Sequence, residues 1–232
     1  MRMIGLYIYD SPFKSVNKVL KKGWYPFGAY PEPIEGVKID LPKRSDTVAK
    51  LYDLHKTPHI EVSCIVGKNG CGKSTLLEVL YRVINNFALW VLDDKANNKH
   101  GRHLHAAKGV YADFYYEQGG KVHKIVCKDT NINFFVEDAN HFLTEYKLSE
   151  GAARLDIFDE FFYTISTNYS LYSLNEDEFI ETLKDKGTID GSWVDGLFHK
   201  NDGYLAPIVI TPFRDHGIVD IENENNLGKP PI

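Results

Sequence analysis

The sequence predicts an α/β fold, built around a strand, a glycine-rich loop and a helix, with an antiparallel β-subdomain beside it. The first observation is an apolar, β-branched run at residues 60–66, which leads directly into the glycines of residues 67–72. The second is the segment behind the loop, where apolar residues recur at helical spacing over residues 76–87. The third is a pair of strand-like runs flanking Gly119-Gly120, which predicts a β-hairpin.

The other elements follow from local composition. Residues 3–9 are β-branched and aromatic and are followed by Asp10-Ser11-Pro12, so they predict a first strand. Residues 23–33 are rich in Pro and Gly and therefore predict a hairpin or surface loop, because prolines fix φ and remove hydrogen-bond donors. Further strands are predicted at residues 132–136, 158–166 and 207–212, short helices at 45–55 and 176–186, and a polar loop at 94–108.

Composition limits the class of protein. The chain has 232 residues, of which 43% are hydrophobic, so it can bury a sizeable core. A net charge of -5 argues against a protein that coats nucleic acid, although a local basic groove remains compatible with it. Three cysteines, no signal-peptide pattern and no apolar run of about 20 residues predict a reduced, cytoplasmic protein without a membrane anchor.

Residues 67–75 carry a pattern that wraps a phosphate. Gly67, Gly72, Lys73 and Ser74 fit G-x-x-x-x-G-K-[ST], in which glycines turn backbone N–H groups toward the anion at a helix N-terminus. We expect Lys73 to reach the β- and γ-phosphates of ATP, and the Ser74 hydroxyl to ligate Mg²⁺. The complete predicted nucleotide-binding set is Gly67, Lys68, Asn69, Gly70, Cys71, Gly72, Lys73, Ser74 and Thr75.

The interior of this loop resembles that of one family. Its G-x-N-G-x-G-K-S-T form is similar to the loop of ABC-type P-loop ATPases, within them to the SMC and DNA-repair branch and to related ATPases of bacterial anti-phage systems. The resemblance covers roughly residues 1–136 and includes the antiparallel hairpin behind the helix. It implies an ATP- and Mg²⁺-dependent cycle in which two copies engage, as a homodimer or higher homo-oligomer, and control DNA or an effector such as a nuclease or toxin.

Two expected features of that family are absent or weak. The L-S-G-G signature does not occur, and the nearest acidic pair is Asp159-Glu160, whose preceding apolar run is broken by Asp156. Glu160 is therefore a weak candidate for polarising the attacking water, and Gln118 a weak candidate for sensing Mg²⁺. Because such ATPases continue into a helical arm, we expect a nucleotide-binding lobe at residues 1–136 and a remainder at 137–232 that leads toward a missing arm or second half.

Three alternatives stay open. The chain is either an active ATPase or a nucleotide-gated scaffold with little hydrolysis of its own, and the weak acidic pair favours the scaffold. A GTPase is disfavoured because no N-K-x-D guanine reader occurs, and a small-molecule kinase because such loops lack the Asn69-Gly70 pair. The cluster His100, His103 and His105 has spacing that can chelate a metal, but a solvated loop is the simpler interpretation.

Overall fold

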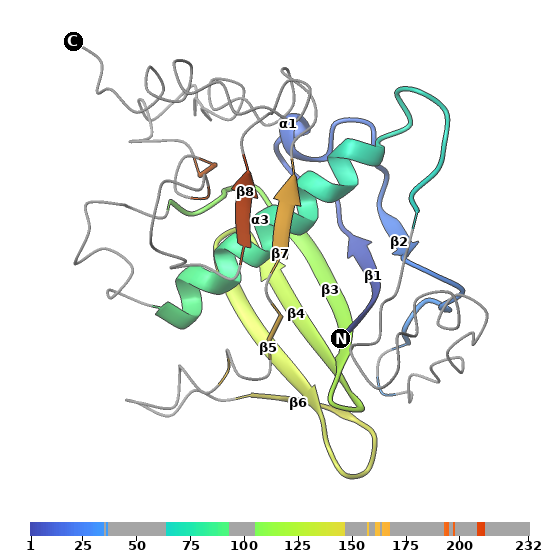
Figure 1. Ribbon diagram of the computed structural model, residues 1–232, viewed down its shortest axis with the longest axis vertical. Coiled ribbons are helices and arrows are strands. Elements are labelled where there is room, and N and C mark those ends of the chain that lie inside the picture. The colour runs from blue at the N-terminus through green and yellow to red at the C-terminus, as the bar shows by residue number, and fades with distance from the viewer. Residues whose placement is uncertain are drawn as a thin grey trace, which may run out of the picture.

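In the computed structural model, a central helix lies between two sheets. The structure describes residues 1–34, 36, 64–92, 105–146, 157, 161–162, 164–167, 193–194, 197 and 208–211. A six-stranded antiparallel sheet packs against one side of helix α3 (Lys73–Leu92), and a two-stranded parallel sheet lies on its other side (Figure 1). The chain is thus a mixed α/β protein, as the sequence predicts.

The large sheet confirms the first predicted strand, at residues 3–9, and three later ones. Its order is β2-β1-β3-β4-β5-β6, with every neighbouring pair antiparallel. The predicted hairpin is β3–β4, which turns at Gly119-Gly120, and the strand predicted at 132–136 is β5. The strands are β1 (Arg2–Ile8), β2 (Gly23–Pro26), β3 (Tyr111–Gln118), β4 (Lys121–Lys128), β5 (Asn131–Glu137) and β6 (Leu143–Glu145).

Helix α3 forms the centre of the hydrophobic core and confirms the predicted helical spacing. Its fully buried side chains include Val83, Ile84 and Phe87. The Phe87 ring lies 5.3 Å from that of Phe134 on the large sheet and 4.6 Å from that of Phe161. By length and composition α3 could cross a membrane, but 67% of that apolar window is buried inside the protein, which is typical of a core helix.

Two buried amides on α3 hold the chain that precedes β3. The Asn86 side chain donates to the carbonyls of Ala107 (2.8 Å) and Asp129 (3.0 Å) and accepts from the Ala107 N–H (2.8 Å). Asn85 donates to the His105 carbonyl at 2.8 Å. Buried backbone groups require such partners, so the last residues of the predicted polar loop are fixed to the core. Residues 94–104 of that loop lie outside the described residues.

The sheet face turned away from α3 carries a buried ion pair. Asp113 is 2% exposed, and its carboxylate accepts from the Tyr9 hydroxyl at 3.0 Å and pairs with the Lys124 ammonium at 2.9 Å. The Lys124 ammonium also lies 5.3 Å from the centre of the Tyr115 ring. Burial, together with the adjacent Asp113 charge, raises the pKa of Tyr9, so its hydroxyl stays a donor.

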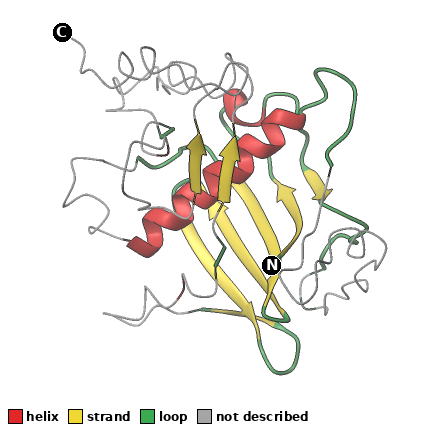
Figure 2. Cartoon of the chain, in the orientation of Figure 1, coloured by secondary structure: helices red, strands yellow, loops and turns green. Residues whose placement is uncertain are grey.

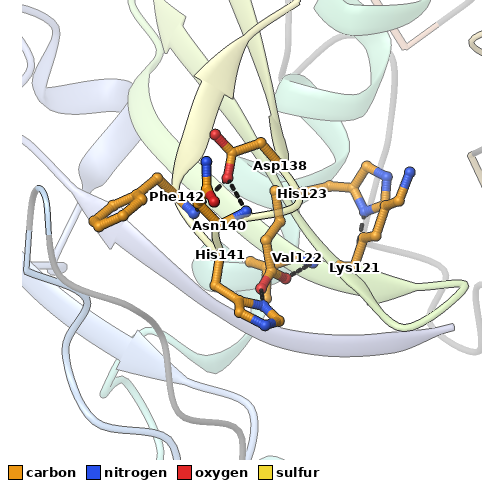
Figure 3. Close-up of polar contacts among 8 residues, drawn as sticks. Lys121, Val122, His123, Asp138, Asn140, His141 and Phe142 are labelled. Carbon is orange, nitrogen blue, oxygen red and sulfur yellow. Dashed lines mark hydrogen bonds and ion pairs between the residues drawn. The ribbon is translucent and has the colours of Figure 1, made fainter.

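The turn between β5 and β6 is ordered by one carboxylate (Figure 3). Asp138 accepts from the backbone N–H groups of Asn140 at 2.8 Å and Phe142 at 3.0 Å, and from the Thr144 hydroxyl. These hydrogen bonds, those to the backbone first, lower the pKa of Asp138. His141, whose φ is 67°, reaches Glu137 at 2.6 Å. Phe142 is left half exposed at the tip.

The small parallel sheet pairs β7 (Thr164–Thr167) with β8 (Ile208–Thr211), as Figure 2 shows beside the helix. Strand β8 confirms the prediction at 207–212. The strand predicted at 158–166 is wrong at Phe161 and Phe162, which precede β7 and pack into the aromatic core instead. The Ser166 hydroxyl donates to the Tyr81 hydroxyl on α3 at 3.0 Å, which joins this sheet to the helix.

One central prediction needs correction. The strand expected at 60–66 is not a strand at residues 64–66, where Cys64 is exposed and Val66 is 81% exposed. An apolar sequence run forms a buried strand only if neighbouring strands flank it, and these residues have no strand partner within the described part of the chain. Residues 60–63 and the helices predicted at 45–55 and 176–186 lie outside the described residues.

Candidate functional site

The predicted phosphate loop is an open turn at the N-terminus of α3. Residues 66–71 are all exposed, and the Cys71 N–H donates to the Lys68 carbonyl at 3.3 Å within the turn. The first helical hydrogen bond runs from the Leu76 N–H to the Gly72 carbonyl at 2.9 Å. The N–H groups that precede it have no intrahelical partner, so they are available to an anion.

The Lys73 side chain reaches back to the first residues of the loop. It donates to the Gly67 carbonyl at 2.8 Å and to the Lys68 carbonyl at 3.0 Å. These bonds join the first turn of the helix to the start of the loop, so the positive charge lies over the exposed backbone. No acidic residue occupies the first turn of α3, which leaves the helix dipole and the ammonium to act together on an anion.

Two glycines of the loop adopt backbone conformations that other residues avoid. Gly70 has φ 77° and Gly72 has φ 98°, both in the region where a Cβ is strained. An ideal Cβ at Gly67 would lie 2.7 Å from the Cys71 sulfur, so the Cys71 side chain lies against the first glycine. Backbone conformation therefore favours glycine at residues 70 and 72, and the close Cys71 side chain leaves little room for a larger residue at 67.

The hydroxyl residues that follow Lys73 are in different environments. Ser74 is exposed at the first turn of the helix, where its hydroxyl fits the role of a Mg²⁺ ligand beside a bound triphosphate. Thr75 is only 6% exposed and lies on the buried side of α3. When Mg²⁺ is bound, it would supply positive charge to the phosphate oxygens, and this chain would hold it through Ser74.

A segment near the N-terminus of the chain lies directly against the loop. It follows the short helix α1 (Lys14–Asn17) and includes Val19 and Leu20. An ideal Cβ at Gly72 would lie 2.7 Å from Leu20 Cδ2 and 3.0 Å from Val19 Cγ2. The Lys18 ammonium contacts both carboxylate oxygens of Glu78 on α3, at 3.0 and 2.8 Å. No sequence signal indicated this contact, because it joins residues about 50 positions apart.

The weak candidate Gln118 is not brought to the loop. Gln118 ends β3, and its side-chain amide donates to the Phe161 carbonyl at 3.2 Å. In Figure 1 the β3–β4 turn lies at the opposite end of the large sheet from the N-terminus of α3. Glu160, His100 and His103 lie outside the described residues, and no group of three metal-ligating side chains occurs within the part that is described.

Comparison with protein families identifies the family of this chain. The sequence profile described as an AAA ATPase domain matches residues 38–199, more than half of the chain. This chain belongs to the AAA ATPase domain family. The matched region contains the phosphate loop and the whole of α3, so the AAA ATPase match and the geometry of Lys73 indicate one P-loop site. Comparison with curated proteins and with solved structures gives no match.

Membership of the AAA ATPase domain family supports ATP binding and ATPase activity in general. It also accounts for the coarse fold, since such domains are α/β proteins with a P-loop. The matched region begins at residue 38, so β1, β2 and the segment against Gly72 lie before it. These N-terminal residues are therefore a feature of the present structure that the family match does not describe.

Proposed function

We propose that this chain binds Mg²⁺·ATP at residues 67–75 and hydrolyses it in a cycle that joins and releases two copies of the chain. The observation that carries the binding step is the position of the Lys73 ammonium, bonded to the Gly67 and Lys68 carbonyls at the open N-terminus of α3. An ammonium held at the loop and helix N–H groups without an intrahelical partner can stabilise the charge of a triphosphate.

The binding step is tested by the variant Lys73→Ala. Charge-assisted hydrogen bonds contribute about 1.5–3 kcal/mol each, so we expect the variant to weaken Mg²⁺·ATP binding by at least tenfold in calorimetric titration. Lys121→Ala is a matched control, because Lys121 is an exposed lysine at the distant β3–β4 turn. Unchanged ATP affinity in Lys73→Ala, with a normal unfolding transition, would contradict the proposed site.

The finer part of the proposal concerns what the cycle does. The loop's resemblance to ABC-type and SMC-like ATPases supports engagement of two copies, with control of DNA or of an effector nuclease or toxin in the cytoplasm, including in anti-phage defence. Light scattering with and without Mg²⁺·ATP tests engagement, and we expect the mass to double with nucleotide. A mass that stays constant at saturating ATP refutes that part while leaving the binding site intact.

A nucleotide-gated scaffold is the second candidate, and one observation favours it. Glu78 is the single acidic residue of α3, and both of its carboxylate oxygens contact Lys18, so it is not available to activate water. Glu160 remains the proposed residue that polarises water. Measuring turnover beside affinity separates the two functions: an ATPase loses turnover in Glu160→Gln at constant affinity, whereas a scaffold binds ATP with negligible turnover in either form.

A further inference from the structure

An exposed aliphatic side chain lies at the rim of the phosphate loop. Val19 is 57% exposed, yet its Cγ2 atom lies 3.0 Å from where a Cβ of Gly72 would be. Leu20, its neighbour, is partly buried and packs against the main core. Leu20 therefore anchors this segment, while Val19 faces outward beside the residue that precedes Lys73.

The segment is held firmly although it is on the surface. The Lys18 ammonium bonds to Glu78, and the Lys18 N–H donates to the Lys14 carbonyl at 2.8 Å. The Leu20 N–H donates to the Asn17 carbonyl at 2.8 Å, and the Asn17 side chain donates to the Tyr9 carbonyl at 2.8 Å. These bonds fix the segment to α3 and to the end of β1, so Val19 occupies a defined position before any ligand binds.

We propose that Val19 forms the nucleoside subsite of the phosphate loop, packing against the base or ribose of the bound nucleotide. The inference rests on the proposed triphosphate site, because the nucleoside must leave the phosphates close to Gly72 and Lys73. Val19 offers methyl groups and no hydrogen-bonding side-chain atom. An aliphatic contact of this kind discriminates weakly between bases, whereas a hydrogen-bonding reader discriminates strongly. Among the described residues beside Gly72, Val19 is therefore a contact that accepts purine nucleotides without selecting adenine over guanine.

The test compares ligands that share the triphosphate but differ in the rest. Calorimetric titrations of the whole chain use Mg²⁺ with ATP, GTP or inorganic tripolyphosphate. Val19→Ser removes the apolar contact at an exposed position, Val19→Ile retains it, and Phe142→Ser is the matched control because it removes another half-exposed apolar side chain, at the distant β5–β6 turn. Urea unfolding of each variant establishes that the fold is intact.

We expect ATP and GTP to bind with similar affinity and both more tightly than tripolyphosphate. Val19→Ser should weaken ATP and GTP by roughly threefold to tenfold and leave tripolyphosphate unchanged, as expected for the loss of one or two methyl contacts. Val19→Ile and Phe142→Ser should bind like the unmodified chain.

Each contrary result has a distinct meaning. Tripolyphosphate binding as tightly as ATP, or unchanged ATP affinity in Val19→Ser, overturns the nucleoside subsite. A strong preference for ATP over GTP overturns the absence of base selection. If none of the three ligands binds, the proposed triphosphate site itself fails, and the subsite fails with it.

Discussion

Replacing Gly72 with alanine tests both the geometry of the phosphate loop and its contact with the N-terminal segment. Gly72 has φ 98°, and a Cβ in a left-handed conformation costs about 1–2 kcal/mol. The new methyl group would also lie 2.7 Å from Leu20 Cδ2. Because Leu20 packs against the core, it moves only at the cost of overpacking, typically about 1–3 kcal/mol. The two costs together give a loss of roughly 2–5 kcal/mol in the free energy of unfolding.

Two other glycines separate these costs. Gly70 and Gly120 have φ 77° and 79°, and an added Cβ at either would have no neighbour within 4 Å. Gly70→Ala and Gly120→Ala should therefore show the strain alone, about 1–2 kcal/mol. The assay is urea unfolding of the three variants, followed by Mg²⁺·ATP titration. Gly70→Ala and Gly72→Ala should both weaken ATP binding, because both distort the loop, while Gly120→Ala should not.

The result that would refute this reasoning is a different order of stability among the three variants. If Gly72→Ala is no less stable than Gly120→Ala, the segment containing Leu20 does not lie against the loop in solution. The proposed nucleoside subsite would then lose its structural basis. If Gly72→Ala retains full ATP affinity, the loop conformation described for residues 67–72 is not the one that binds nucleotide.

Three further predictions concern the hydrophobic core, the cysteines and the β5–β6 turn. Asn86→Ala removes two buried hydrogen bonds and one partly buried one and leaves the Ala107 N–H unpaired, so urea unfolding should show a loss of about 3–5 kcal/mol in the free energy of unfolding. A loss near zero would mean that water replaces the amide. Burial raises the pKa of Cys127 to about 12, so alkylation at pH 8 should modify the two exposed cysteines and spare Cys127 until the chain unfolds. Bound Mg²⁺·ATP should protect Cys71 from the reagent. Modification of all three thiols in the folded chain would contradict the burial of Cys127. The pKa of Asp138 is lowered by its hydrogen bonds, so the protection that it gives the β5–β6 turn is present at neutral pH and lost as pH falls through the lowered pKa. The protection factor of the Phe142 amide, which compares its exchange rate with that of an unstructured peptide at the same pH, should therefore fall in acid and in Asp138→Ala at neutral pH. An unchanged protection factor in the variant would refute the role of the carboxylate.

Several elements of this protein could be predicted from local sequence because their physical causes are local. The apolar spacing behind the loop is sufficient to predict α3, since one face of a helix must be buried. The glycines at 119 and 120 supply the positive φ values that a tight hairpin turn needs, so the β3–β4 hairpin and the position of its turn could be predicted. Residues 64–66 show the limit of this reasoning, because an apolar run does not specify a strand without its neighbours.

The sequence by itself determined the identity of the phosphate loop, because Gly70, Gly72 and Lys73 are required by backbone conformation and charge whatever surrounds them. It also determined that α3 would begin at this loop and be buried. Only the tertiary structure decided that Val19 and Leu20 lie beside Gly72, and that Gln118 lies at the far end of the sheet. Contacts of this kind depend on how the strands pair and on which side of α3 each segment packs, and no local pattern of residues encodes those long-range choices.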